Sequence, residues 1–322
     1  MSSHPGGAKG RPLHKRAVGA ALGAVLGALN LLRRVYMRVF MSLDFYKKAH
    51  CDFVPRPTDI FISSYPRSGT TWMQMIMYQL TSDGDMEKLA HISQHIPFFE
   101  NALAFAGPGV LERMPAPRLF KTHIRYKWTP LGPAKCIYIA RNGKDVLVSY
   151  YHHEMTGRGY KGSFDDFARM FFAGKVMHGS WFKHVAEWYA HRSDPNILFL
   201  TYEELAGDLE GTIRRVIEFC GFDIAPERLP QIVERCGFAY MKKYEPKFSP
   251  MAEQELLLGI KRDEFIRKGK VGGWREYMTP EQLAEFDRAY EETLGGIEVD
   301  LKEPKPAGAP ARALAHAQES PK

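Results

Sequence analysis

The stretch Asp59-Ile-Phe-Ile-Ser-Ser64 is followed by Tyr65-Pro-Arg-Ser-Gly-Thr-Thr71 and then by Trp72-Met-Gln-Met-Ile-Met-Tyr-Gln-Leu80. The first part is a short, mostly apolar run, which is typical of a buried strand. After Gly69 the apolar residues recur at a helical period, and Pro66 and Gly69 mark a turn between the two segments. The stretch therefore predicts a strand, a tight loop and a helix.

The loop before this helix has the features of an anion site. Backbone N–H groups at a helix start point one way, and the helix dipole adds partial positive charge there. Arg67 adds a full charge to the same loop. The nucleotide P-loop pattern G-x-x-x-x-G-K-[ST] would need Gly at Ser64 and Lys at Thr70, and both are missing. We therefore expect an anion-binding loop of a different type.

Further apolar runs at residues 118–123, 135–140 and 196–201 resemble the first strand, and helical patterns follow at 144–153 and 209–220. Strands that alternate with helices favour a parallel sheet with both faces covered. We predict a single α/β domain with a central parallel sheet, helices on both faces and a P-loop-like strand-loop-helix unit. Other segments are predicted as helices at 164–172, 181–189 and 280–294, and as irregular aromatic loops at 95–100 and 105–117.

The net charge of the 322-residue chain, +7 at pH 7, is concentrated in residues 1–50. This segment holds nine of the 44 Lys and Arg residues and one of the 37 acids, which leaves 35 basic and 36 acidic residues elsewhere. A near-neutral body does not indicate a nucleic-acid partner. The four cysteines show neither metal-ligand spacing nor a disulfide framework, so we expect a cytoplasmic location and no metal.

The N-terminal segment contains an apolar run at residues 17–32, bracketed by Lys15-Arg16 and Arg33-Arg34. A bilayer span needs about 20 apolar residues, so this run is short. Its glycines form a doubled G-x-x-x-G pattern. Two interpretations stay open: membrane or self-association through residues 17–41, and a mobile leader. The predicted boundaries are 1–50 for this segment, 51–300 for the α/β domain and 301–322 for a disordered tail.

Polar residues stand at the ends of predicted strands, where ligands of open α/β sheets gather. Lys121 and His123 end the strand at 118–123, and Arg141 follows the strand at 135–140. Lys121 and His123 are therefore catalytic candidates, although a lone histidine is more often structural. Ser149 lies within a predicted helix, and its position alone indicates a solvated serine.

Several motifs together resemble the cytosolic-type sulfotransferases, which use 3′-phosphoadenosine 5′-phosphosulfate (PAPS). The first loop resembles the family's Y-P-K-S-G-T-T-W, and Lys121-Thr-His123 resembles its K-T-H. The other matching segments, in the family's order, are His95-Ile-Pro-Phe-Phe-Glu100 (acceptor-side loop), Arg141-Asn-x-Lys-Asp-Val-x-Val-Ser-Tyr-Tyr-His152, Gly179-Ser-Trp-Phe-x-His-Val-x-x-Trp188 and Arg267-Lys-Gly-x-x-Gly-x-Trp274. The resemblance extends from about Asp59 to Leu294.

The resemblance implies sulfuryl transfer from PAPS to a hydroxyl or amine of a small acceptor. It implies His123 as the catalytic base, with Lys121 and Arg67 as cations at the reacting sulfate. The residues that would bind PAPS are Arg67, Ser68, Gly69, Thr70 and Thr71 at the 5′-phosphosulfate, Arg141, Ser149, Arg267, Lys268 and Gly269 at the 3′-phosphate, and Trp72, Phe238, Tyr202 and Met241 at the adenine. The aromatic residues Phe98, Phe99, Phe105, Tyr126 and Trp128 suggest an apolar or aromatic acceptor, such as an alcohol or phenol. The same side chains could equally belong to the hydrophobic core.

The chain departs from the family pattern at several positions. Arg67 replaces the loop lysine, Gly273 replaces an Asp, and Cys236 replaces a Thr or Ser near the 3′-phosphate. The family's dimerisation motif is degraded over residues 275–284, so we do not predict the dimer. The alternatives are a P-loop nucleotide kinase, which the missing lysine disfavours, and a non-catalytic nucleotide-binding protein, which the retained Lys121 and His123 disfavour.

Overall fold

The computed structural model describes residues 51–249, 266, 269, 271–297 and 301, together with residues 25, 28, 29 and 32. Its strands are β1 (Ile60–Ser64), β2 (Leu119–Thr122), β3 (Lys135–Ala140) and β4 (Ile197–Thr201). They form one parallel sheet in the order β2-β1-β3-β4. The four predicted strands are confirmed. The order reverses at β1, which places a topological switch point between β1 and β3.

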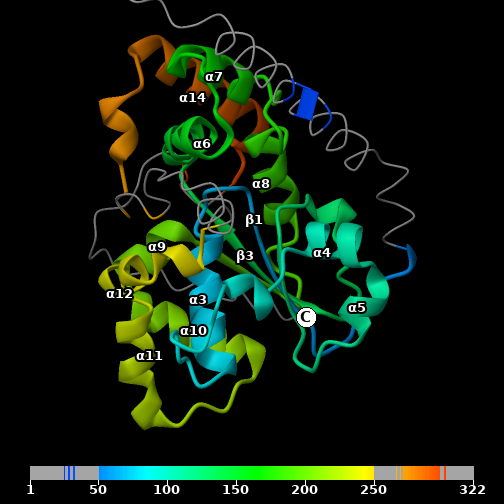
Figure 1. Ribbon diagram of the computed structural model, residues 1–322. Helices are drawn as coiled ribbons and strands as arrows, with labels where there is room; N and C mark the ends of the chain where they lie inside the picture. The colour runs from blue at the N-terminus through cyan, green and yellow to red at the C-terminus, as the bar shows by residue number, and fades with distance from the viewer. Residues whose placement is uncertain are drawn as a thin grey trace, which may run out of the picture.

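Alternate side chains of the strands pack into two separate cores. Ile62 of β1 and Ile139 of β3 pack with α3 (Thr70–Thr81), α10 (Leu209–Cys220) and α11 (Leu229–Arg235). Phe61 and Tyr138 point the other way and pack with α6 (Gly143–Arg158), α8 (Trp181–Ala190) and α14 (Pro280–Leu294). Figure 1 shows these two groups of helices on opposite sides of β1 and β3. The predicted parallel sheet with both faces covered is therefore confirmed.

The remaining elements connect these layers. Three of these elements are the α-helices α7 (Phe164–Phe172), α9 (Tyr202–Gly207) and α12 (Phe238–Lys243). Short 3-10 turns lie at Ile92–Gln94, Tyr126–Trp128, Pro226–Arg228, Glu245–Lys247 and Gly273–Glu276. The bounds predicted for α7, α10 and α14 agree with the structure, and the Thr279 side chain caps α14. Helix α6 is longer than its prediction and ends at Gly159, which has a left-handed φ of 68°.

The prediction of irregular loops at 95–100 and 105–117 is wrong over two short helices, α4 (Phe99–Ala106) and α5 (Pro108–Glu112). Gly107, with φ 74°, separates them, and Pro108 opens α5. Phe99 is buried among Phe53, Phe61 and Phe120. Tertiary packing of this aromatic cluster stabilises helices that are too short to show a clear period in the sequence.

Three predictions fall wholly or partly outside the described residues: the domain boundaries near residues 50 and 300, the association of residues 17–41, and the contribution of Arg267 and Lys268. Within the described part of the chain, no helix has the length and apolar character needed to cross a membrane.

Candidate active site

The predicted site residues gather at the carboxyl ends of the inner strands and β2. The loop 65–69 follows β1, His123 follows β2, and Arg141 follows β3. Because β1 and β3 flank the switch point, their two loops border the crevice in which such sheets bind ligands. The fold therefore brings the anion loop, the candidate base and Arg141 to one edge of the sheet.

The anion loop leaves the start of α3 without a side-chain cap. Gly69 is the N-cap residue, makes no side-chain hydrogen bond, and is followed by no acid in the first turn. Its φ of 101° favours glycine, and a Cβ there would lie 2.9 Å from Cδ2 of Tyr202. The Ser68 hydroxyl is buried and has no hydrogen-bond partner among the described residues. An uncapped helix start beside an orphaned hydroxyl fits a phosphate or sulfate group.

Arg67 connects the anion loop to α6 and to Arg141. It is the one residue other than glycine with positive φ among those described, at 70°. Its Nε donates to Ser149 Oγ at 3.1 Å, and its carbonyl oxygen accepts from Arg141 Nη1 at 3.0 Å. Ser149 is only 9% exposed, so its interpretation as a solvated serine is wrong. The inward face of α6 places it beside two cations.

His123 is held by three hydrogen bonds from different elements. Its N–H donates to Glu100 Oε1 at 2.9 Å, and its Nδ1 lies 2.8 Å from the Ser64 carbonyl oxygen. Its own carbonyl oxygen accepts from His184 Nε2 at 3.3 Å, and Tyr138 OH lies 3.0 Å from His184 Nδ1. A carbonyl oxygen can only accept, so Nδ1 of His123 carries the hydrogen and Nε2 presents a lone pair. The ring is oriented as a proton acceptor.

Burial and neighbouring charge shift the protonation of the two catalytic candidates. Burial, the Lys121 charge and His178 hold the pKa of His123 well below its usual value, so the imidazole is neutral near pH 7. Burial lowers the pKa of Lys121 to about 8, with Glu100 opposing this shift and Arg67 adding to it. Near pH 7 the strand end therefore carries a neutral imidazole beside a charged ammonium.

Aromatic rings lie on the other side of the anion loop. The Trp72 ring centroid is 5.5 Å from that of Tyr202, and its Nε1 donates to the Cys236 carbonyl oxygen at 2.8 Å. The Arg141 guanidinium carbon lies 4.2 Å from the Tyr202 ring centroid. This arrangement brings Trp72, Tyr202 and Arg141 together, while the Cys236 thiol is buried and its carbonyl makes the contact.

A second aromatic surface comes from α12. Phe238 is 46% exposed, and Met241, one turn later, is buried. A Cβ at Gly269 would lie 2.6 Å from Cδ2 of Phe238, and the φ of Gly269 is 60°. The glycine therefore permits close approach of its backbone to the ring. The predicted contributions of Arg267 and Lys268 lie outside the described residues.

Asp145 supports the site in a way that the sequence interpretation did not single out. Its Oδ2 accepts from Gly272 N at 2.7 Å, and its Oδ1 accepts from Trp274 N at 3.2 Å. This carboxylate of α6 holds the last signature loop, in which Gly273 stands in place of the family's Asp. The available signal was an acid in the first turn of a helix that follows a strand at the site.

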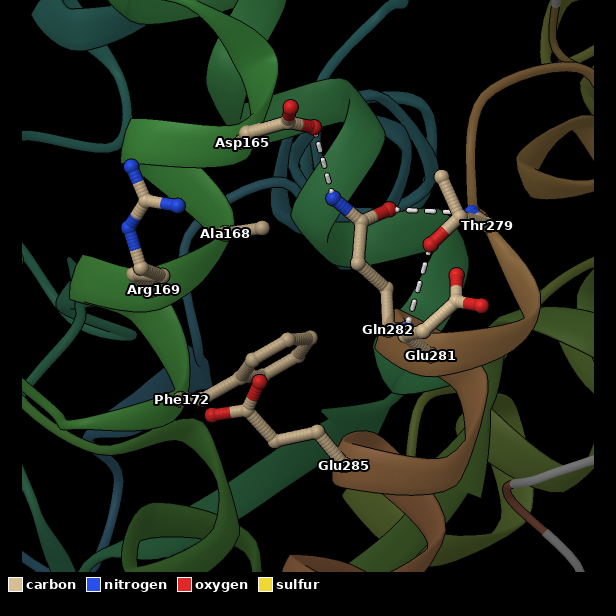
Figure 2. A pocket seen from close by; sticks show the side chains of 8 residues that line it. All are labelled: Asp165, Ala168, Arg169, Phe172, Thr279, Glu281, Gln282 and Glu285. Atoms are coloured by element: carbon tan, nitrogen blue, oxygen red, sulfur yellow. Dashed lines mark hydrogen bonds between the residues drawn. The ribbon is translucent and has the colours of Figure 1, made fainter.

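A surface hollow between α7 and α14 contains none of the predicted site residues (Figure 2). Figure 2 shows Gln282 reaching Asp165, and this Nε2 to Oδ1 hydrogen bond measures 2.8 Å. Among the described residues, no group of three His, Cys, Asp or Glu side chains could hold a metal ion. The site that organises the chemistry is therefore the edge of the sheet.

Comparisons with known proteins agree with this geometry. The family described as "Sulfotransferase domain" matches residues 57–298. Sulfotransferase 1B1 of Mus musculus is 34% identical over 261 residues, which cover 78% of this chain and 87% of that protein. The amine sulfotransferase of Oryctolagus cuniculus is 34% identical over 274 residues, covering 81% and 86%. A crystal structure of retinol dehydratase with androsterone and the inactive cofactor PAP has a TM-score of 0.69 at 28% identity, covering 79% and 87%.

The fold and the matched relatives define a class of enzyme, a transferase that uses a phosphosulfate donor. The chain belongs to the sulfotransferase family. This membership confirms the predicted class of enzyme, a PAPS-dependent sulfotransferase that acts on a small-molecule acceptor. It sets aside the two alternatives, a kinase and a non-catalytic binding protein.

Proposed function

We propose that this chain transfers the sulfuryl group of PAPS to a hydroxyl or amine, with His123 as the base and Lys121 and Arg67 as the cations at the sulfate. The observation that carries these roles is the hydrogen bond from His123 Nδ1 to the Ser64 carbonyl oxygen, 2.8 Å long. It turns the Nε2 lone pair of a neutral imidazole toward an acceptor. Lys121 lies two residues earlier on the same strand end.

The residues that would hold PAPS occupy two ends of the crevice. The uncapped start of α3 and the Ser68 hydroxyl suit the 5′-phosphosulfate, with donors from Arg67, Ser68, Gly69, Thr70 and Thr71. Arg141 and Ser149, with Arg267, Lys268 and Gly269, suit the 3′-phosphate. The Trp72 and Phe238 rings suit the two faces of the adenine, with Tyr202 and Met241 beside it.

Bound PAPS would supply a sulfuryl group attached to a phosphate leaving group. Near pH 7, Nε2 of His123 can take the proton of an attacking hydroxyl. Lys121 and Arg67 place positive charge in a partly buried site, where attraction to developing negative charge is stronger than in water. A sulfuryl group carries less negative charge than a terminal phosphoryl group, so side-chain cations serve where kinases use Mg²⁺.

We propose an apolar or aromatic acceptor, because an apolar phenylalanine ring lies beside the proposed base. The Phe98 centroid lies 5.4 Å from that of His123. Phe99 belongs to the core, and Tyr126 stacks on His191 with centroids 3.5 Å apart, so neither ring supports the acceptor proposal. The relatives named for an amine and crystallised with androsterone support acceptors of both kinds, amine and alcohol.

The direct test is turnover of labelled PAPS against a panel of phenols, sterols, lipid alcohols, amines and sugars. The expected result is labelled sulfate ester or sulfamate from at least one apolar acceptor, lost in the His123→Ala variant. Transfer that persists undiminished in that variant, or binding of ATP in preference to PAPS, would overturn the proposal.

We propose that the enzyme is cytoplasmic and that its catalytic domain comprises residues 51–300. We also propose that residues 17–41 of the N-terminal segment associate with membranes or with a second copy of the chain. Val25, Leu29 and Leu32 lie in helix and are 55%, 56% and 64% exposed. Their spacing of four and three puts them on one helix face. The unpaired cysteines suit a reducing compartment. Deleting residues 1–50 should leave activity intact and abolish sedimentation with anionic vesicles, and an inactive deletion would contradict this division.

A further inference from the structure

Glu100 is a buried carboxylate whose purpose the reaction described above does not explain. It lies in the first turn of α4 and is 5% exposed. Its Oε1 accepts from the His123 N–H, and the Thr122 side chain also favours its charged form, while its Oε2 is buried without a partner in hydrogen-bond geometry among the described residues. Buried carboxylates are uncommon and normally have all oxygens paired, so an incompletely paired one beside the candidate base requires an explanation.

The segment that contains Glu100, residues 97–100, is hydrogen-bonded at two points to β2 and to the residue that follows it. β2 lies at the edge of the sheet, and Phe98 forms a parallel bridge with Lys121 along that edge. The Lys121 N–H donates to the Pro97 carbonyl oxygen at 2.9 Å, and the His123 N–H donates to Glu100. The backbone N–H groups of both catalytic candidates therefore donate to residues 97–100.

The titratable side chains that interact with Lys121 and His123 at the end of β2 are mostly basic. Arg67 and Glu100 act electrostatically on Lys121, whereas Lys121, His178 and His184 act on His123. Among these interacting groups Glu100 is the one acid. The Lys121 Nζ also lies 5.3 Å from the Phe98 ring centroid, and burial disfavours its charged form.

We propose that Glu100 is a positioning residue of the transfer reaction: it fixes the end of β2 through the His123 N–H and keeps Lys121 in its charged form. The proposal rests on the proposed function, in which Lys121 acts as a cation at the sulfate. Glu100 acts through these two residues and not on the acceptor itself.

The mutual electrostatic effect of Glu100 and Lys121 agrees with this role. Burial raises the pKa of Glu100 to about 7, against the hydrogen bond from His123 and the charge of Lys121. Burial lowers the pKa of Lys121 to about 8. The negative charge of ionised Glu100 favours the protonated form of Lys121. Without that charge Lys121 would lose its proton at lower pH.

The test is the titration of Lys121 in full-length protein that carries ¹³Cε-lysine, observed by NMR without any donor and assigned with Lys121→Arg. Glu100→Gln keeps an oxygen for the His123 N–H but removes the charge. It should lower the pKa of Lys121 by about one unit or more. Glu203→Gln is the matched control, since the buried Glu203 accepts from Asn142 N at 3.0 Å and interacts with Arg141 instead. An unchanged Lys121 titration in Glu100→Gln would overturn the inference.

A second measurement separates failure of this inference from failure of the proposed function. In Glu100→Gln, the fall of kcat/KM for PAPS at alkaline pH should begin at a lower pH than in the wild type. Lys121→Arg in that background should restore activity at alkaline pH. If NMR shows the lowered pKa but the alkaline limb does not move, the role of Lys121 in the reaction is wrong and the positioning role of Glu100 falls with it.

Discussion

The two ends of the candidate site are built from different chemistry. At the sulfate end, burial moves the pKa of Lys121 and of His123 downward, and main-chain hydrogen bonds fix their positions. At the nucleotide end, an arginine lies over a tyrosine ring and Phe238 is left exposed. Groups whose charge can change suit proton transfer, whereas a permanent guanidinium and rings suit binding. Substitutions at the two ends should therefore damage different steps.

The largest effect should come from His123→Ala. Loss of a positioned general base typically lowers the rate by about 10²–10⁴-fold. The affinity for PAP should remain that of the wild type, because the ring bonds to the Ser64 carbonyl oxygen and lies beside the Phe98 and His178 rings, and none of these is a proposed nucleotide contact. Steady-state rates and calorimetric titration with PAP check the two halves. A rate within a few-fold of wild type would place the base elsewhere.

Arg67 lies between the two ends, since its side chain reaches Ser149 and its charge acts on Lys121. Arg67→Ala should lower kcat by about 10²–10³-fold, the usual cost of removing one group that stabilises developing charge. Arg67→Lys, the matched control, should keep much of the activity because it keeps the cation. Equal rates in the two variants would show that Lys121 and the backbone donors suffice.

At the nucleotide end, Trp72→Ala or Phe238→Ala should weaken PAP binding by about 1–3 kcal/mol each, the usual worth of a base stacked on an aromatic ring. The rate at saturating PAPS should change little. Calorimetry with PAP measures the first effect and single-turnover kinetics the second. Unchanged PAP affinity in both variants would mean that these rings do not hold the adenine.

The effect that is smallest at neutral pH is a change in pH dependence. The Lys121 ammonium loses its proton above pH 8 or so in the free enzyme, so kcat/KM for PAPS should fall about tenfold for each further pH unit. Lys121→Arg should remove this limb, because a guanidinium stays charged throughout that range. If kcat/KM falls at the same alkaline pH in the wild type and in Lys121→Arg, the group that titrates there is not Lys121.

The sequence predicted those parts of the site that depend on local pattern. Apolar runs located all four strands, and motif order located the residues at their ends. It failed for α4 and α5, which are too short for a period. The position of Ser149 in a helix did not reveal that this residue faces inward, although the motif resemblance placed Ser149 among the residues predicted at the 3′-phosphate. It also missed Glu100 and Asp145, which act on backbone N–H groups 23 residues away at His123 and 127 residues away at Gly272. Such pairs exist only after the chain has folded.

The central claim is that reaction and binding are separated between the two ends of the crevice, and one paired measurement tests it most directly. His123→Ala and Trp72→Ala are compared for single-turnover rate at saturating PAPS and for the dissociation constant of PAP. The account predicts that His123→Ala loses rate by about 10²-fold or more at unchanged affinity, and that Trp72→Ala loses affinity at nearly unchanged rate. Rate and affinity that fall together in both variants would contradict it.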